Sequence, residues 1–240
     1  MKKNKDHYSA KNFEISNFEQ TLKKRKNIYN EYGFRGDSIK KEGFKIMSIG
    51  CSLTEGIGVE ENETWSSQLC QKIPNSVNLN FGFGGRSNDY ISRCLLAFYD
   101  LVKPDLVLIM YTETHRREFF NKDFNVEPFH HKKWGYFEKD ENGQREHDAL
   151  LCLLNKGNNY HNWLKNHLLI KYFLEAKKCN WLWDGWYATD FYRDENRFDG
   201  DFYPFLDLGS DNIHPGPITH KTYANKLYDY IKTNHAGIIQ

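Results

Sequence analysis

Residues 45–56, KIMSIGCSLTEG, contain the pattern that decides the fold. The first part is typical of a buried strand, which runs into Gly50, Cys51 and Ser52 and then into a helix start. In an open parallel sheet the ligand site lies beyond the carboxyl ends of the strands, so Ser52 is expected to face that site. Ser52 would also lie near the unpaired N–H groups of the helix start, which can stabilise a developing anion. The alternative is that Ser52 or Thr54 only caps the helix, the commoner role of a hydroxyl in such a stretch.

The rest of the chain alternates between strand and helix patterns. Strands are predicted at 44–50, 76–82, 104–110 and 180–186, with a fifth around 202–208. Helices are predicted at 63–73, 87–102 and 159–178 and after Pro217. The apolar positions expected to face the core from the last two helices are Trp163, Leu168, Leu169, Tyr172, Phe173, Tyr223, Leu227, Tyr230 and Ile231. This alternation predicts an α/β fold, a three-layer, flavodoxin-like sandwich with a mostly parallel sheet and helices on both faces.

The domain organisation predicted from these patterns is simple. Residues 1–43 form a polar N-terminal extension, and residues 44–240 form one domain that carries the site. Within it, residues 115–150 are polar and lack a clean period, which indicates an insertion that is functional or mobile.

Composition excludes several classes of function. The chain has 240 residues and a net charge of +1, so no charged field favours nucleic acid or a membrane surface. No segment approaches the roughly 20 apolar residues of a membrane span, and no secretory signal is recognisable. The five cysteines form no CxxC pair, and His130 and His131 have no ligand at metal spacing. We therefore expect a cytoplasmic protein without a metal site. A phage could also encode such a protein. The sequence leaves the oligomeric state open.

The stretch GSDNIHPG, residues 209–216, contains Asp211 and His214 just before the last predicted helix. A serine hydroxyl becomes a good nucleophile when an imidazole accepts its proton, and a carboxylate can orient that imidazole. Turns rich in Asp, Asn, Gly and Pro also contain this pattern by chance, so Asp211 and His214 alone are weak support for catalysis.

A third stretch, NLNFGFGGRSND, places Asn80, Gly82 and Gly85 after the second predicted strand. Glycine at a strand exit lets the backbone approach a ligand and leaves an N–H free to bind an oxyanion. An ordinary tight turn is the alternative.

Together, these residues resemble the SGNH (GDSL-type) hydrolases. The first block of the family is matched by Gly50 and Ser52, with Cys51 where the family has Asp, and the second block by Asn80, Gly82 and Gly85. The last block is matched by Asp211 and His214, followed by Pro215. The third block, Gly-x-Asn-Asp, is not matched, because residues 112–115 read Thr-Glu-Thr-His. Thr114 stands at the asparagine position, where its hydroxyl could donate instead, and His115 and Arg116 are the other candidates for the missing group.

The resemblance implies a serine esterase without a metal or organic cofactor. Ser52 would be the nucleophile, His214 the general base and Asp211 its orienting partner, and the N–H groups of Ser52 and Gly85 would hold the oxyanion. The aromatic and polar loops favour a short acyl ester, for instance on a carbohydrate, as the partner. Arg116, Asn80 and Trp186 are predicted to contact this substrate, although arginines at loop starts more often form surface salt bridges. The alternative function is a non-catalytic module that binds a glycan or a protein, for example in a phage or a surface-glycan system.

Overall fold

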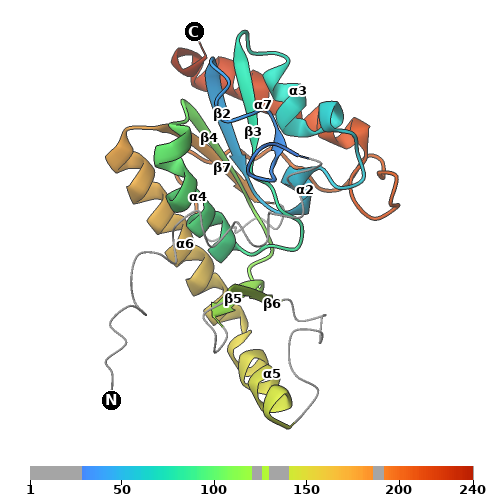
Figure 1. Ribbon diagram of the computed structural model, residues 1–240, viewed down its shortest axis with the longest axis vertical. Coiled ribbons are helices and arrows are strands. Elements are labelled where there is room, and N and C mark those ends of the chain that lie inside the picture. Colours follow the sequence, from blue (N-terminus) through green and yellow to red (C-terminus); the bar gives the residue numbers. More distant parts are fainter. Residues whose placement is uncertain (1–28, 121–125, 130–140, 186–191, 240) are drawn as a thin grey trace.

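A central β-sheet organises the protein, for which the computed structural model describes residues 29–120, 126–129, 141–185 and 192–239 (Figure 1). The five strands of the sheet lie in the order β1-β3-β2-β4-β7. They are β1 (Arg35–Gly36), β2 (Phe44–Ile49), β3 (Ser76–Asn80), β4 (Leu106–Tyr111) and β7 (Asn180–Gly185). The last four strands pair in parallel, and β1 joins the edge antiparallel to β3. The first parallel strand, β2, lies between the second and the third, as in flavodoxin-like sheets, so the switch point for ligands lies at the carboxyl ends of β2 and β4.

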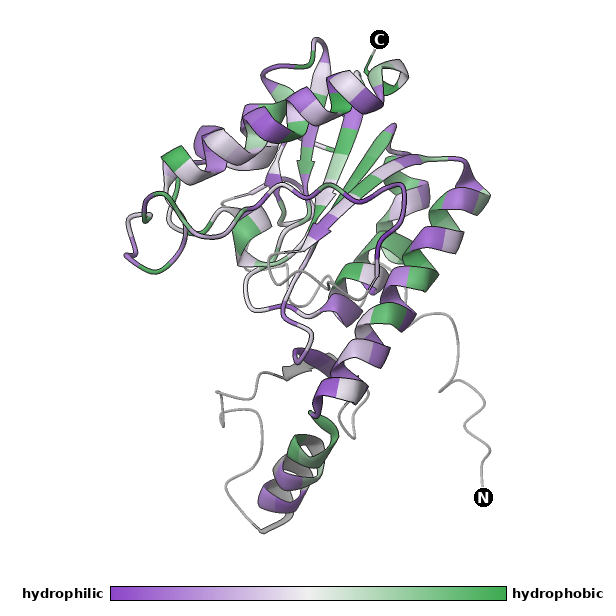
Figure 2. Ribbon diagram, turned by 180° about the vertical axis from the view of Figure 1, so that it is seen from behind, coloured by the Kyte–Doolittle hydropathy of each residue, from purple (hydrophilic) through white to green (hydrophobic). Residues whose placement is uncertain are grey.

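Helices cover both faces of this sheet. In the described ranges the helices are α2 (Ser52–Glu55), α3 (Trp65–Cys70), α4 (Asn88–Val102), α5 (Glu141–Leu153), α6 (Lys156–Lys177) and α7 (Pro217–Asn234), with short 3-10 turns at Glu61–Glu63 and Ala236–Ile238. Side chains of α4 and α6 form one hydrophobic cluster with the sheet, and side chains of α3 and α7 form another. In Figure 2 the centre of the sheet is hydrophobic, whereas the helices have mixed faces. The three-layer α/β fold predicted from the sequence is therefore confirmed. None of the helices in the described ranges combines the length and apolarity needed to cross a membrane.

Strand β4 shows why the most apolar run of the sequence is central. Val107, Ile109 and Tyr111 point to the α4/α6 side, whereas the alternating residues, Leu108 among them, point to the α3/α7 side. A strand buried on both faces needs apolar residues at every position, because successive side chains point to opposite faces.

The predicted apolar face of α6 is partly wrong. Leu169 is 44% exposed and Tyr172 62% exposed. Trp163 is buried as predicted, but the other large side chains that the helix buries are His167, Ile170 and Leu174. His167 can replace an apolar residue there because Tyr111 and Asp194 bond its two ring nitrogens, each at 3.1 Å.

The fifth strand is also not where the sequence predicted it. Residues 202–208 form no strand, and only Leu208 makes an isolated bridge, to Pro215. The fifth strand is β1, which lies in the segment predicted to be an N-terminal extension. The described part of that segment, residues 29–43, thus packs with the domain.

The predicted insertion contains the strands β5 (Arg117–Phe120) and β6 (Val126–Phe129) and the helix α5, which projects away from the sheet (Figure 1). Its base is tied to α4 by a buried ion pair. Arg93 donates Nε and Nη2 to the Glu118 carboxylate at 3.0 and 2.9 Å. The backbone N–H of Glu118 also donates to Asp89. The start of the insertion is therefore fixed to the body of the protein.

We expect Glu118→Ala to lower the free energy of unfolding by about 3–5 kcal/mol, because it leaves the Arg93 guanidinium buried without its carboxylate. The control is Glu195→Ala, since Glu195 is 73% exposed in its ion pair with Lys171, and we expect a loss of about 1 kcal/mol or less. Urea unfolding curves measure both values. Equal losses in the two variants would contradict a structural role for the buried pair.

Candidate active site

Ser52 lies at the first position of α2, directly beyond the end of β2. The turn before it requires glycine, because a Cβ at Gly50 would lie 2.1 Å from the Thr54 hydroxyl oxygen. Neither Ser52 nor Thr54 caps the helix: the N-cap residue is Cys51, which makes no side-chain cap bond, and the Thr54 hydroxyl has no hydrogen-bond partner in the described part of the chain. Ser52 is 9% exposed, with Oγ 3.9 Å from Cys51 Sγ. Cys51 belongs to the hydrophobic cluster on the α3/α7 side, so its side chain packs in the core.

Asn80 ties the exit of β3 to α2. Its Nδ2 donates to the Thr54 carbonyl at 2.7 Å, and its Oδ1 accepts the Gly82 N–H at 2.9 Å. A Cβ at Gly82 would lie 2.2 Å from the Glu55 nitrogen, so the two turns pack backbone against backbone. Asn80 is fully buried. Its predicted contact with substrate is therefore a wrong interpretation: the amide is used to hold the turn.

The glycine turn after β3 lies beside Ser52. Glu55 accepts the Gly84 N–H at 2.6 Å, and a Cβ at Gly84 would lie 3.7 Å from the Ser52 Cβ. Gly85 has a φ of +73°, and open space surrounds the position that a Cβ would take there. Among the described residues, no hydrogen-bond acceptor meets the backbone N–H of Ser52 or of Gly85. Two free N–H donors thus lie close to the serine, as an oxyanion hole requires.

Asp211 and His214 form a bonded pair in the loop before α7. His214 Nδ1 lies 2.5 Å from Asp211 Oδ2, and Asp211 Oδ1 accepts the backbone N–H groups of Ile213 and His214 at 3.0 Å. The hydrogen bond from the His214 side chain, helped by these backbone bonds, lowers the pKa of Asp211 to about 2. An ionised Asp211 accepts a hydrogen bond from Nδ1–H, which leaves the unprotonated Nε2 of the ring as the site that can take a proton.

The loop that carries this pair packs on the segment that follows Ser52. Ser210 donates its backbone N–H to the Gly58 carbonyl at 2.8 Å. A Cβ at Gly58 would lie 3.0 Å from Asp211 Oδ1. No hydrogen bond joins Ser52 and His214 in the described structure. Catalytic hydrogen bonds are often long without substrate and shorten only in the complex. The loop of Asp211 and His214 therefore packs on the segment that follows Ser52, and within it the Asp211–His214 hydrogen bond is formed.

The exit of β4 carries the residues of the unmatched third block. Asn88 fixes this exit, since its amide accepts the Thr112 N–H at 2.9 Å and donates to the Thr112 carbonyl at 3.1 Å. Thr114 follows in a half-buried turn. Arg116 Nε donates to Glu113 at 2.8 Å. Arg116 therefore forms the salt bridge that was the alternative to substrate binding.

Trp186, also predicted to contact substrate, lies outside the described residues. Glu55 and Asn88 also hold the turns of the site, and neither was predicted as a site residue from the sequence. The sequence signal for Asn88 was its position at the predicted helix start, and Glu55 was quoted only as part of the first stretch.

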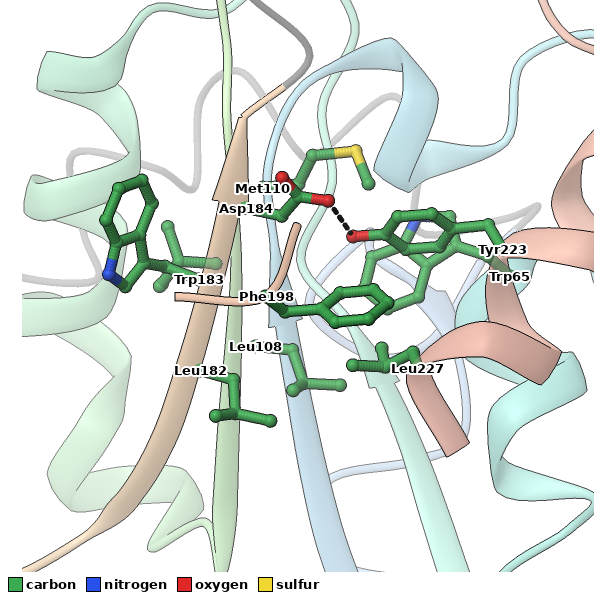
Figure 3. Close-up of a pocket in the computed structure, with 10 residues that line it drawn as sticks. Trp65, Leu108, Met110, Leu182, Trp183, Asp184, Phe198, Tyr223 and Leu227 are labelled. Carbon is green, nitrogen blue, oxygen red and sulfur yellow. Dashed lines mark hydrogen bonds between the residues drawn. The ribbon is translucent and has the colours of Figure 1, made fainter. Parts of the chain in front are cut away.

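A small cavity of about 10 Å³ lies beneath the carboxyl end of β7 (Figure 3). Its lining is apolar except for Asp184, whose Oδ2 accepts bonds from the Tyr223 hydroxyl at 3.0 Å and the Gly200 N–H at 3.2 Å. This volume holds about one water molecule, so the cavity is part of the core and not a substrate pocket. Burial raises the pKa of Asp184 to about 6, because the charged carboxylate is desolvated.

This raised pKa predicts a pH-dependent stability. As the pH rises, Asp184 loses its proton near its ordinary pKa of 3.8 in the unfolded chain, but only near pH 6 in the folded protein. The contribution of Asp184 to stability is therefore present at low pH and is lost as the pH rises from about 4 to above 6, by about 3 kcal/mol in total. Buried His220, whose pKa is lowered to about 4, acts in the opposite direction over much of this range.

The measurement is therefore the difference between the wild type and Asp184→Asn. We expect the stability advantage of the wild type, from urea unfolding, to shrink by about 3 kcal/mol between pH 4 and pH 7. A constant difference across this range would show that Asp184 titrates normally.

Of three comparisons with known proteins, the one with solved structures gave matches. No family model matches the sequence, and no curated protein matches it. Among solved structures, the chain is similar to a family 3 carbohydrate esterase of Clostridium thermocellum (15% identity, TM-score 0.41, 83% of this chain and 100% of that chain). It is also similar to a psychrotrophic esterase of Pseudoalteromonas sp., with 18% identity and a TM-score of 0.39, over 79% of this chain and 97% of that chain. A third similar structure is that of a putative G-D-S-L family lipolytic protein of Desulfitobacterium hafniense DCB-2, with 15% identity and a TM-score of 0.35, over 78% of this chain and 98% of that chain. With identities under 25% and TM-scores under 0.5, what the site does follows from the geometry of this chain alone.

Proposed function

We propose that the protein is a serine-dependent ester hydrolase that removes a short acyl group, such as an O-acetyl group, from a carbohydrate. The observation that carries the proposal is the bonded Asp211–His214 pair, packed on the segment that directly follows Ser52. A carboxylate, an imidazole and a hydroxyl in this order are what nucleophilic acyl transfer needs.

In this proposal Ser52 Oγ attacks the ester carbonyl while His214 Nε2 takes its proton. The negative charge that develops on the carbonyl oxygen is held by the N–H groups of Ser52 and Gly85. His214 then protonates the leaving alcohol, and the acyl group remains on Ser52. A water molecule, deprotonated by His214, releases the acid and restores the serine.

The surroundings of His214 support a bulky polar leaving group. The His214 and Asp211 side chains are 24% and 29% exposed, so solvent reaches both groups. Ile213, at 72% exposed, offers an apolar contact next to polar loop residues. Carbohydrates have both apolar faces and hydroxyl groups, so they fit this mixed rim.

The direct test is ester hydrolysis. We expect the wild type to hydrolyse p-nitrophenyl acetate, and to release acetate from an O-acetylated monosaccharide, much faster than His214→Ala. A non-catalytic binding module is the second candidate, favoured by the open Ser52–His214 bond and the unmatched third block. It predicts equal rates for the two proteins, with retained binding of the deacetylated sugar in calorimetry.

Thr114 is the proposed third donor to the oxyanion. We expect Thr114→Val, which keeps the shape but removes the hydroxyl, to lower kcat by about 100-fold and to change KM little. The matched control is Thr222→Val, on α7, which should keep wild-type kinetics. An unchanged kcat in Thr114→Val would show that the two backbone N–H groups act without Thr114.

A further inference from the structure

Arg35 lies in β1, within the segment that carried no predicted role, yet its guanidinium reaches the turn of Ser52. Its Nη1 donates to the carbonyls of Glu55 and Gly56 at 2.9 and 2.6 Å. Its Nη2 donates to the Val59 carbonyl at 2.8 Å. Both terminal nitrogens of the guanidinium are thus engaged by the backbone that leads from Ser52 toward Gly58.

The first two of these carbonyls lie at the end of α2, a helix that cannot be stable alone. α2 has four residues and ends at Gly56 in the left-handed conformation. A single turn pays the full nucleation cost of a helix and leaves its last carbonyls unpaired. A guanidinium at this end satisfies those carbonyls with charge-assisted bonds and complements the partial negative charge of the helix terminus.

Arg35 is itself held firmly in place. Its backbone pairs with Asn80 in the sheet register. Phe34 before it is fully buried, with its ring 4.3 Å from that of Phe81. Asp37 after it accepts the Asn78 N–H at 2.9 Å. The side chain therefore extends from a fixed strand, and its geometry is set before any substrate binds.

The same backbone segment supports the acid–base loop. The Gly58 carbonyl, between the carbonyls of Gly56 and Val59 that Arg35 holds, accepts the Ser210 N–H at 2.8 Å. We infer that Arg35 is a positioning residue that sets Ser52 relative to the Asp211–His214 pair by clamping the segment between them. This inference rests on the proposed ester hydrolysis. Arg35 does not contact substrate in it, because its terminal donors point at backbone carbonyls.

The experiment compares Arg35→Met and Arg35→Lys with the wild type. The control is Arg193→Met, since Arg193 is 66% exposed in its ion pair with Asp199. We expect Arg35→Met to lower kcat for p-nitrophenyl acetate by about 100-fold with KM nearly unchanged, because small displacements of catalytic groups affect the rate and not binding. Arg35→Lys, which keeps a charged donor but not the fork, should recover part of the loss. Arg193→Met should have wild-type kinetics.

Hydrogen exchange supplies the readout that does not depend on activity. The N–H groups of Gly56 and Ser210 should exchange about 10-fold faster in Arg35→Met than in the wild type, whereas core amides of β4 should not change. Unchanged exchange at both amides, or a kcat within twofold of wild type, overturns the inference. If the wild type hydrolyses no ester, the proposed function fails, and the exchange rates still decide whether Arg35 clamps this segment.

Discussion

Ser52→Ala is expected to lower kcat for ester hydrolysis by about 10⁶-fold, to the residual rate that substrate binding and the oxyanion donors alone support. Alanine removes the hydroxyl oxygen that becomes acylated in the proposed mechanism, while the 9% exposed side chain is small enough for the turn to keep its shape. Steady-state rates with p-nitrophenyl acetate, backed by circular dichroism of the folded variant, measure this loss.

The matched control for this loss is Cys51→Ala, at the neighbouring position. Cys51 is 3% exposed and packs in the core, so its thiol should not act as the nucleophile. We expect this variant to keep its kcat within about 10-fold of the wild type, with some loss of stability from the small cavity. Hydrolysis that survives Ser52→Ala but is lost in Cys51→Ala would transfer the nucleophilic role to the thiol.

Asp211→Asn is expected to lower kcat by about 10⁴-fold, with KM changed far less. The Asp211 carboxylate accepts both the His214 ring nitrogen and two backbone N–H groups. An asparagine oxygen can keep the backbone bonds, but its amide then donates toward His214 Nδ1 and favours the wrong tautomer of the ring.

The pKa of about 2 for Asp211 gives this prediction a pH range. The carboxylate of the wild type stays ionised until the pH falls to about 2, so loss of the Asp211 charge does not limit activity above about pH 4. Asp229→Asn, on the exposed side of α7, is the control and should behave as the wild type. Equal kinetics for Asp211→Asn and the wild type would remove Asp211 from the proposed mechanism.

Patterns that are local in sequence predicted much of the fold. The turn at Ser52 could be recognised because strand, glycine and helix follow one another within one short stretch. The Asp211–His214 bond was likewise foreseen, since the two residues lie in one turn and need no long-range contact to meet.

Features that depend on contacts between distant segments were missed. β1 has only two residues, too few to show an alternating pattern, and it forms because Phe34 is buried against Phe81 and Phe98. The Arg35 guanidinium binds backbone carbonyls. Because every residue has such a carbonyl, no sequence motif could indicate this contact. Tertiary hydrogen bonds likewise placed His167 in the core, which shifted the buried face of α6.

The most direct test of the account is to locate the adduct of a fluorophosphonate probe on the wild-type protein by tandem mass spectrometry. We expect one adduct, on Ser52, which forms slowly in His214→Ala and is absent in Ser52→Ala. An adduct on another residue, or no adduct on a folded protein that hydrolyses esters, would contradict the central claim that Ser52 is the nucleophile.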